Sequence, residues 1–246
     1  MSETRAKPEE RYARAMSEKR LPKPGEVADA EALSGSDAAQ AHVRRWWRLM
    51  PQVLTRPTEV FAALRDDDEI DVDARAEPIL AIVIVAGMAG ILLTPAWGTL
   101  VDEESLDWIV LAVITFIGGL FYGAAGYFLL GFVVWLGARA VGLETRSRTA
   151  RQLVGFSALP FALSFFVTVP AVLVGFGYDW FRTGGSDEGA GRLVVLSVGF
   201  AFALWSLGLL ALGLRTTFEL PWRAVVGALA LAAVIVAAFA VLPSAF

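Results

Sequence analysis

Apolar residues are distributed very unevenly along this chain. Residues 1–77 are mainly polar, whereas residues 78–246 consist largely of apolar runs separated by short polar stretches. A helix needs about 20 apolar residues to cross the hydrocarbon core of a bilayer. The pattern therefore predicts an all-α integral membrane protein whose transmembrane domain, residues 78–246, is a five-span helical bundle. The predicted spans cover about 78–97, 108–142, 152–176, 193–214 and 222–242.

The second run, 108–142, is too long for one ordinary span. It could form two spans, one long helix, or one span with an interfacial extension. The flanking loops favour a single span, because Lys and Arg stay on the cytoplasmic side of a membrane. Residues 98–107 carry acids without Lys or Arg, whereas residues 139–151 carry several arginines. We predict one span that leaves the membrane near Trp135 and extends to Gly142 in the cytoplasm.

The same charge rule predicts the orientation of the whole chain. Most Lys and Arg lie in residues 1–77, and Arg215 and Arg223 flank the connection between the last two apolar runs. With five spans these positions share one side, so the N-terminus is inside and the C-terminus outside the cytoplasm. The excess of Arg over Lys is typical of a bacterium with a GC-rich genome. We therefore expect a multi-pass protein of the bacterial plasma membrane.

The first 38 residues have the composition of a disordered cytoplasmic tail. They are rich in Glu, Lys, Arg, Ser, Pro and Gly and show little periodic hydrophobicity. Such a segment buries too little apolar surface to offset the entropy of ordering. It also lacks the apolar core of a cleavable signal peptide, so the first span is expected to direct insertion.

Residues 39–77 combine an amphipathic segment with an acidic linker. Apolar residues recur at helical spacing with arginines opposite them, and Pro57 suits the first turn of a second helix. We predict short amphipathic interfacial helices before the first span, with tryptophans at headgroup depth and arginines against anionic lipid headgroups. Alternatively, the apolar face packs on the protein's own loops. The predicted membrane-interface residues are Arg44, Arg45, Trp46, Trp47, Arg48 and Phe61.

Candidate chemistry is sparse along the whole sequence. There is no cysteine and only one histidine, His42, so thiol catalysis, disulfides, and zinc sites built from Cys or paired His are excluded. The predicted spans hold no central charged residue, which argues against a proton-coupled transporter. Their serines lack a histidine partner. We therefore predict a protein that is not an enzyme and uses no cofactor.

Small residues and prolines indicate how the spans pack. Gly119 and Gly123 form a GxxxG pair, which lets two helices approach closely, either within the chain or between copies. Pro160 and Pro170 interrupt the third span and predict a kink.

Several stretches resemble the Ypt-interacting-protein (YIP) domain family, in its bacterial form. They are "LTRPTEVFAALRDDD", "RQLVGFSALPFAL" and "LWSLGLLALGLRTTFELPWRAVVGALALA", and the resemblance covers roughly residues 51–242. The usual tyrosine after the glycine of the third span is Phe156 here. The residues that match the family's motifs are Pro57, Phe61, Gly155, Pro160, Gly213 and Leu214.

The resemblance implies five spans, a cytoplasmic N-terminus and no known catalytic residue. The "DLYGP" signature that is linked to Golgi traffic and Rab partners is absent, so Rab binding is not transferred. We interpret the chain as a non-enzymatic membrane scaffold or adaptor; the alternative is a permease component for a neutral or lipid-like solute. A closed bundle would favour the scaffold, and a continuous polar cavity would favour the permease. Expected partners are the bilayer, anionic headgroups and a protein or second copy, but not nucleic acid.

Overall fold

The computed structural model describes residues 24–65, 69–92, 102, 107–140, 143, 146–182 and 190–241, and the regular elements in these ranges are helices. The chain divides into two compact units, Met1–Ala41 and His42–Phe246. Each unit is described by itself. The second unit holds the apolar helices and the core.

Helix α2 (Pro24–Leu49) begins well before the amphipathic segment. Residues 24–38 were predicted to be disordered, but they are helical here; residues 1–23 lie outside the described part of the chain. Alanine and glutamate are frequent in this stretch, and both favour helix without any apolar face. Pro24 also suits a first helical turn. The sequence pattern did not indicate this helix, because the prediction relied on apolar periodicity, which residues 24–38 lack.

Three short helices precede the first long apolar helix: α3 (Gln52–Thr55), α4 (Pro57–Ala63) and α5 (Glu69–Ala74). Two prolines set their boundaries. Pro51 follows the end of α2, where its ring opposes continuation, and Pro57 occupies the first turn of α4. Short helices before the first span are therefore present, while their position at a membrane surface stays a prediction.

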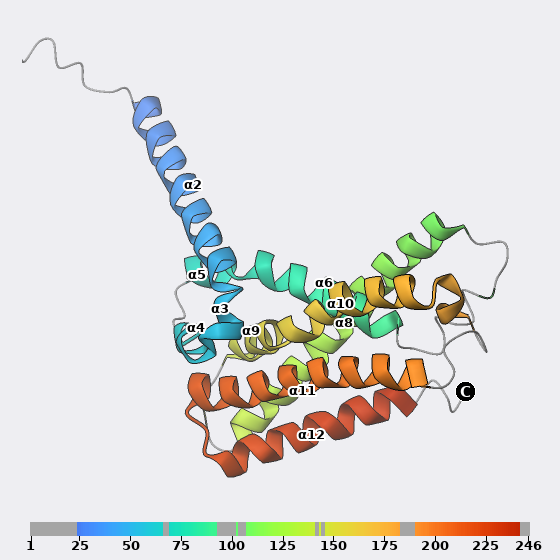
Figure 1. Cartoon of the computed structure of the whole chain (residues 1–246). Coiled ribbons are helices and arrows are strands. Elements are labelled where there is room, and N and C mark those ends of the chain that lie inside the picture. Colours follow the sequence, from blue (N-terminus) through green and yellow to red (C-terminus); the bar gives the residue numbers. More distant parts are fainter. Residues whose placement is uncertain are drawn as a thin grey trace, which may run out of the picture. The chain divides into compact units, whose positions relative to one another are not determined.

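The remaining elements form the apolar bundle (Figure 1). They are α6 (Ala76–Leu92), α8 (Trp108–Ala140), α9 (Ser147–Ser157), α10 (Leu159–Gly175), η1 (Tyr178–Phe181), α11 (Ala190–Phe218) and α12 (Trp222–Val241).

Four stretches of the bundle are long and apolar enough to cross a bilayer, namely Asp71–Leu92, Trp108–Ala140, Ser147–Gly175 and Gly191–Phe218. A shorter apolar stretch, Trp222–Leu231, lies in α12. The protein is therefore an all-helical membrane protein. The fifth span stays a prediction. Helix α8 is uninterrupted over its 33 residues, which agrees with one helix rather than two in the second apolar run.

The third predicted span is divided near its first proline. Helix α9 ends at Ser157, and α10 begins at Leu159 with Pro160 in its first turn. Pro160 has no N–H, and its ring disturbs the helical hydrogen bonds around it. The backbone N–H of Phe161 donates instead to Ser206 Oγ on α11, at 3.0 Å. Pro170 lies inside α10, which continues to Gly175.

Helices α6 and α8 cross at glycines from both helices. A methyl group built on Gly87 would lie 2.6 Å from the backbone nitrogen of Gly123 and would overlap the carbonyl of Gly119. A methyl group on Gly119 would lie 2.7 Å from the backbone nitrogen of Met88. The GxxxG pair thus faces a helix of the same chain. Backbones this close leave no space for a side chain.

We expect Gly119→Ala to lower the free energy of unfolding by about 1–3 kcal/mol, because the added methyl overpacks this crossing. Gly126→Ala on the same helix is the matched control, since a methyl group there meets no atom within 4 Å. Its effect should be small or slightly stabilising, as alanine favours helix. Thermal unfolding of the purified proteins in one detergent compares them. Equal losses in both variants would contradict the crossing.

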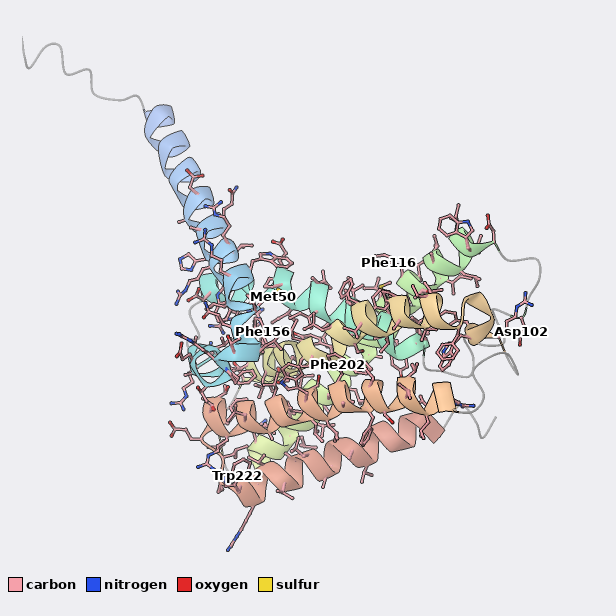
Figure 2. All side chains as sticks on the ribbon, in the orientation of Figure 1. Met50, Asp102, Phe116, Phe156, Phe202 and Trp222 are labelled. Atoms are coloured by element: carbon pink, nitrogen blue, oxygen red, sulfur yellow. The ribbon has the colours of Figure 1, made fainter. Side chains whose placement is uncertain are left out.

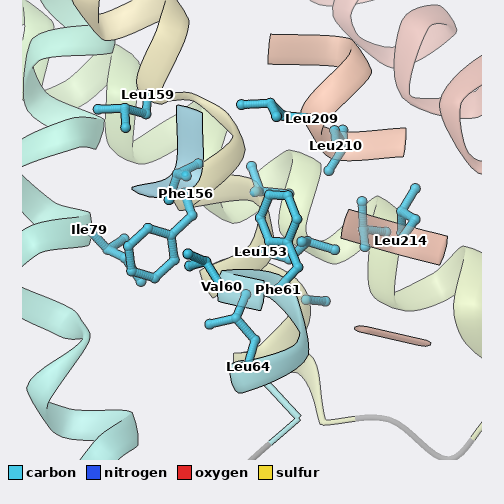
Figure 3. Close-up of a cluster of buried hydrophobic side chains, with 14 of the residues drawn as sticks. Val60, Phe61, Leu64, Ile79, Leu153, Phe156, Leu159, Leu209, Leu210 and Leu214 are labelled. Carbon is cyan, nitrogen blue, oxygen red and sulfur yellow. The ribbon is translucent and has the colours of Figure 1, made fainter. Parts of the chain in front are cut away.

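The largest buried cluster joins the short helices to the bundle (Figure 3). Val60, Phe61 and Leu64 come from the α4 region and are almost completely buried. They meet Leu153 and Phe156 of α9 in the same cluster. The cluster also includes Ile79, Leu159, Leu209, Leu210 and Leu214, from α6, α10 and α11.

Large apolar side chains cover the outside of the bundle as well. Phe116 of α8 is half exposed, whereas Phe156 is buried (Figure 2). Phe121, Phe166 and Phe200 are each more than half exposed, on α8, α10 and α11. Exposed apolar surface of this extent is unusual for a soluble protein and typical of a surface that contacts lipid.

Candidate functional site

Residues 42–65, here called the cap, comprise the end of α2 with α3 and α4. Trp46 anchors the cap and is only 1% exposed. Its ring lies 5.7 Å from the ring of Phe156 on α9, and the guanidinium carbon of Arg75 lies 4.5 Å from its centroid. Its indole N–H donates to Asp71 Oδ1 at 3.2 Å. One tryptophan therefore contacts α5, α9 and the α5–α6 junction.

Arg75 stands at the centre of the same site and is fully buried. Its Nη1 donates to Gln152 Oε1 at 3.2 Å, and its Nη2 donates to the carbonyl of Ala63 at 3.1 Å. Gln152 Nε2 in turn donates to the carbonyl of Val72 at 3.0 Å. A buried charge is tolerated only where such partners replace water. The network fixes the end of α4 to α5 and α9.

The carboxylate of Asp71 contacts polar side chains from the end of α2. His42 Nδ1 lies 2.8 Å from Asp71 Oδ1, and Arg45 Nη1 lies 3.8 Å from Asp71 Oδ2. The Asp71 side chain is 9% exposed, while those of His42 and Arg45 are 33% and 59% exposed. The carboxylate thus accepts a hydrogen bond from the buried Trp46, and it contacts His42 and Arg45 on the side that faces solvent.

The two adjacent tryptophans have different environments. Trp47 is 39% exposed and donates its indole N–H to Glu77 Oε1 at 3.2 Å. Arg44 and Arg48, on its side of α2, are also exposed. The apolar face of the cap packs on the protein itself, as in the alternative interpretation of the sequence.

The six residues that were predicted to lie at the membrane interface fall into a buried and an exposed group. Trp46 and Phe61 were predicted to lie at the membrane surface, but both are buried in the protein. Trp46 packs against Phe156 of α9, and Phe61 packs against α11. The other four side chains are exposed, and their contact with lipid stays a prediction. These four residues are Arg44, Arg45, Trp47 and Arg48.

The other end of the cap is attached to α11. Thr217 Oγ1 donates to the carbonyl of Phe61 at 3.0 Å, and Arg65 Nε donates to the carbonyl of Thr216 at 2.9 Å. Arg65 also pairs with Glu219 at 2.7 Å. This ion pair is exposed and contributes little to stability, so the buried contacts of Phe61 provide most of the attachment.

Three residues that match the family's motifs, Phe61, Gly213 and Leu214, meet at this attachment. A methyl group on Gly213 would lie 3.4 Å from Phe61 Cδ1, and Leu214 is buried in the same cluster. A methyl group on Gly155 would lie 2.5 Å from Ile79 and 3.3 Å from the ring of Tyr127. The glycines therefore allow α9 and α11 to approach their neighbours closely.

A family model, the Yip1 domain, matches residues 52–242. The chain belongs to the Yip1 domain family. The match begins within the cap, after Trp46, and ends just past α12. It therefore includes Asp71, Arg75 and Gln152 and the described apolar helices, while Trp46 precedes it. No curated protein and no solved structure matches the sequence significantly. Members of this family are membrane proteins that are not known as enzymes.

Arginines mark one end of the Yip1 domain. The ends of α8 and α11 and the starts of α9 and α12 meet at the same end as the cap. Arg139 lies over the ring of Trp135 at 5.1 Å, and Arg215 lies over the ring of Trp222 at 4.8 Å. Arginine and tryptophan side chains in such pairs are typical of membrane interfaces.

A small cavity lies between α6, α10, η1 and α11, at the other end of the Yip1 domain. Its volume is about 40 Å³, and Ser164 and Thr168 are its polar lining residues from α10. Their hydroxyls donate to the carbonyls of Phe161 and Ser164, at 2.6 and 2.7 Å. A cavity of this volume has room for only a few water molecules. In the described ranges no three His, Cys, Asp or Glu residues gather as metal ligands.

Three residues of the cap anchor were not among the predicted site residues. Asp71 and Arg75 lie in the acidic stretch that was interpreted as a solvated linker, and Gln152 was counted only as the start of a span. One signal was present: Arg75 is the only base among the acids of that stretch, "DDDEIDVDARAE". An isolated base of this kind often indicates a specific partner.

Proposed function

We propose that this Yip1-domain protein is a non-enzymatic membrane scaffold or adaptor, and that the cap presents its binding surface. The burial of Trp46 carries the proposal. It fixes the cap on the bundle, so that Arg44, Trp47 and Arg48 form one exposed face with a defined position. Such a face suits anionic lipid headgroups, acidic protein surfaces, or both.

The small cavity supports a scaffold over a permease. A pocket that encloses a small molecule usually has several hundred Å³, whereas this cavity has about 40 Å³. Its two hydroxyl donors are used by helix carbonyls. Passage of a neutral or lipid-like solute would require the helices around it to separate.

The test of the scaffold is capture of partners from membranes after cross-linking, with the intact chain as bait. We compare the wild type with an Arg44→Gln and Arg48→Gln double variant. Proteins that use the cap should be recovered at least severalfold less with this variant, because two exposed charges of the face are lost. Arg223→Gln is the control, since Arg223 is exposed at the same end but on α12. Recovery that is equal for all three baits would contradict the proposal.

The orientation proposed is five spans with the arginine-rich end in the cytoplasm of a bacterium. Arginines in residues 139–151 and at Arg215 and Arg223 support it. Alkaline phosphatase, which is active only in the periplasm, should be inactive when fused at Thr145 and active when fused after Phe246. An active fusion at Thr145, or an inactive one after Phe246, would contradict the orientation or the span count.

A further inference from the structure

Arg151 occupies an unusual position for a charged residue. The sequence analysis assigned it to the loop 139–151, but α9 already begins at Ser147. Arg151 therefore lies on the helix, within the apolar stretch Ser147–Gly175 that is long enough to span a membrane. A charged side chain inside a span is costly and usually has a function.

The packing on α8 sets the depth of Arg151. A methyl group on Gly131 would lie 2.9 Å from the Cα atom of Arg151, so the two backbones are close at this level. At about 1.5 Å per residue, Gly131 lies about 6 Å deeper along α8 than Trp135 and about 12 Å deeper than Arg139. Arg151 thus belongs at the boundary between headgroups and acyl chains.

Within the described residues, the neighbour found for the guanidinium of Arg151 is an aromatic ring rather than an acid. Its carbon lies 5.1 Å from the ring centroid of Phe128, and its Nε is buried without a hydrogen-bond partner among the residues that the structure describes. The ion pairs found in the described ranges do not include it. Arg75, the fully buried arginine, donates to Gln152 and to the carbonyl of Ala63.

The surface of α8 beside Arg151 is exposed and aromatic. Phe128 and Phe132 of α8 are 54% and 53% exposed. Arg148 lies one turn earlier on α9, with a side chain that is 59% exposed and only 3.9 Å from Asp73 at its closest. The ring of Tyr127, also on α8, lies 5.3 Å from the ring of Phe128, and a methyl group on Gly155 of α9 would lie 3.3 Å from the Tyr127 ring. Arg148, Arg151 and Tyr127 therefore lie beside an exposed aromatic surface of α8.

We propose that Arg151, together with Arg148 and Tyr127, binds the phosphate group of an anionic phospholipid in the leaflet at the arginine-rich end. The guanidinium donates to the phosphate oxygens, and Phe128 and Phe132 contact the acyl chains. A planar guanidinium matches phosphate geometry and forms strong hydrogen bonds to it. This inference requires only that the protein spans a membrane and is independent of the scaffold role.

The test is binding of a fluorescent short-chain phosphatidylglycerol to the purified full-length protein in a neutral detergent. Arg151→Met keeps the apolar stem and removes the charge, and should weaken binding about tenfold or more. Arg148→Met, on an exposed side chain, should weaken it severalfold without affecting the fold. Arg223→Met is the matched control on α12 and should bind like the wild type. Thermal unfolding checks the fold of each variant. If Arg151→Met proves unstable, the binding measured for Arg148→Met decides the test.

Two further probes identify the ligand. Phosphatidylcholine of the same chain length should compete weakly, because its headgroup is zwitterionic, and millimolar inorganic phosphate should not displace the lipid. Displacement by inorganic phosphate would indicate a site for a free anion and would overturn the lipid assignment. Equal binding by wild type, Arg148→Met and Arg151→Met would overturn the site itself, whatever the outcome of partner capture with the cap variants.

Discussion

Replacing Trp46 with alanine is expected to lower the free energy of unfolding by about 3–5 kcal/mol, the usual cost of removing a large buried aromatic side chain. The indole lies between Phe156 and Arg75, and its buried N–H donates to Asp71 Oδ1. Alanine would leave a cavity there and would remove the hydrogen bond to the carboxylate. The cap would lose the contact between this indole and Phe156 of α9.

The neighbouring tryptophan provides the control within the same helix. Trp47→Ala removes a side chain of equal size, but Trp47 is 39% exposed and its hydrogen bond to Glu77 is at the surface. We expect a loss below about 1 kcal/mol, because substitutions at exposed positions usually have small effects. Both variants are compared by thermal unfolding in one detergent and by proteolysis of the cap. Similar losses for the two tryptophans would mean that the burial of Trp46 is not what holds the cap.

The long apolar helices could be predicted from the sequence because their signal is local. Helix α8 runs from Trp108 to Ala140, close to the predicted 108–142, since continuous apolar sequence specifies a membrane helix without reference to other segments. The close approach at Gly119 was predictable for the same reason. A small residue on an apolar helix indicates contact, although its partner on α6 could not be derived from spacing.

The environment of the cap could not be predicted in the same way. Trp46 and Trp47 are adjacent and flanked by arginines, and helical spacing alone does not say which one is buried. The distinction depends on Phe156, more than a hundred residues later in the chain, and on Arg75 in an apparently solvated acidic stretch. A lipid headgroup layer and a protein surface both bind an amphipathic helix through its apolar face. The sequence pattern was therefore compatible with either environment.

The buried anchor also affects how the proposed scaffold would respond to charge. Asp71 and Glu77 lie close to Arg45 and Trp47 and compete with an external anion for the same groups. Arg44 and Arg48 are not in the described ion pairs. They are therefore the positions where an acidic partner or headgroup gains most, because it displaces only water and counterions.

Replacing Arg75 tests whether the cap depends on the polar network as well as on Trp46. Arg75→Met preserves much of the side-chain volume but leaves Gln152 Oε1 and the carbonyl of Ala63 without these donors. Each unsatisfied buried group costs about 1–3 kcal/mol, so we expect a loss of about 2–6 kcal/mol in the free energy of unfolding. Arg56→Met is the control, because Arg56 makes only an exposed pair with Glu59, worth less than about 1 kcal/mol.

The double variant with Gln152→Leu separates the network from simple packing. Gln152→Leu alone removes one acceptor of Arg75 and the donor to the carbonyl of Val72. If the two side chains act as a unit, the double variant should lose less stability than the sum of the single variants, by about 0.5–3 kcal/mol. Chemical unfolding in a mixed detergent measures all four proteins. Strict additivity would mean that Arg75 and Gln152 stabilise the cap separately, and the anchor would then be the indole of Trp46 rather than a connected network.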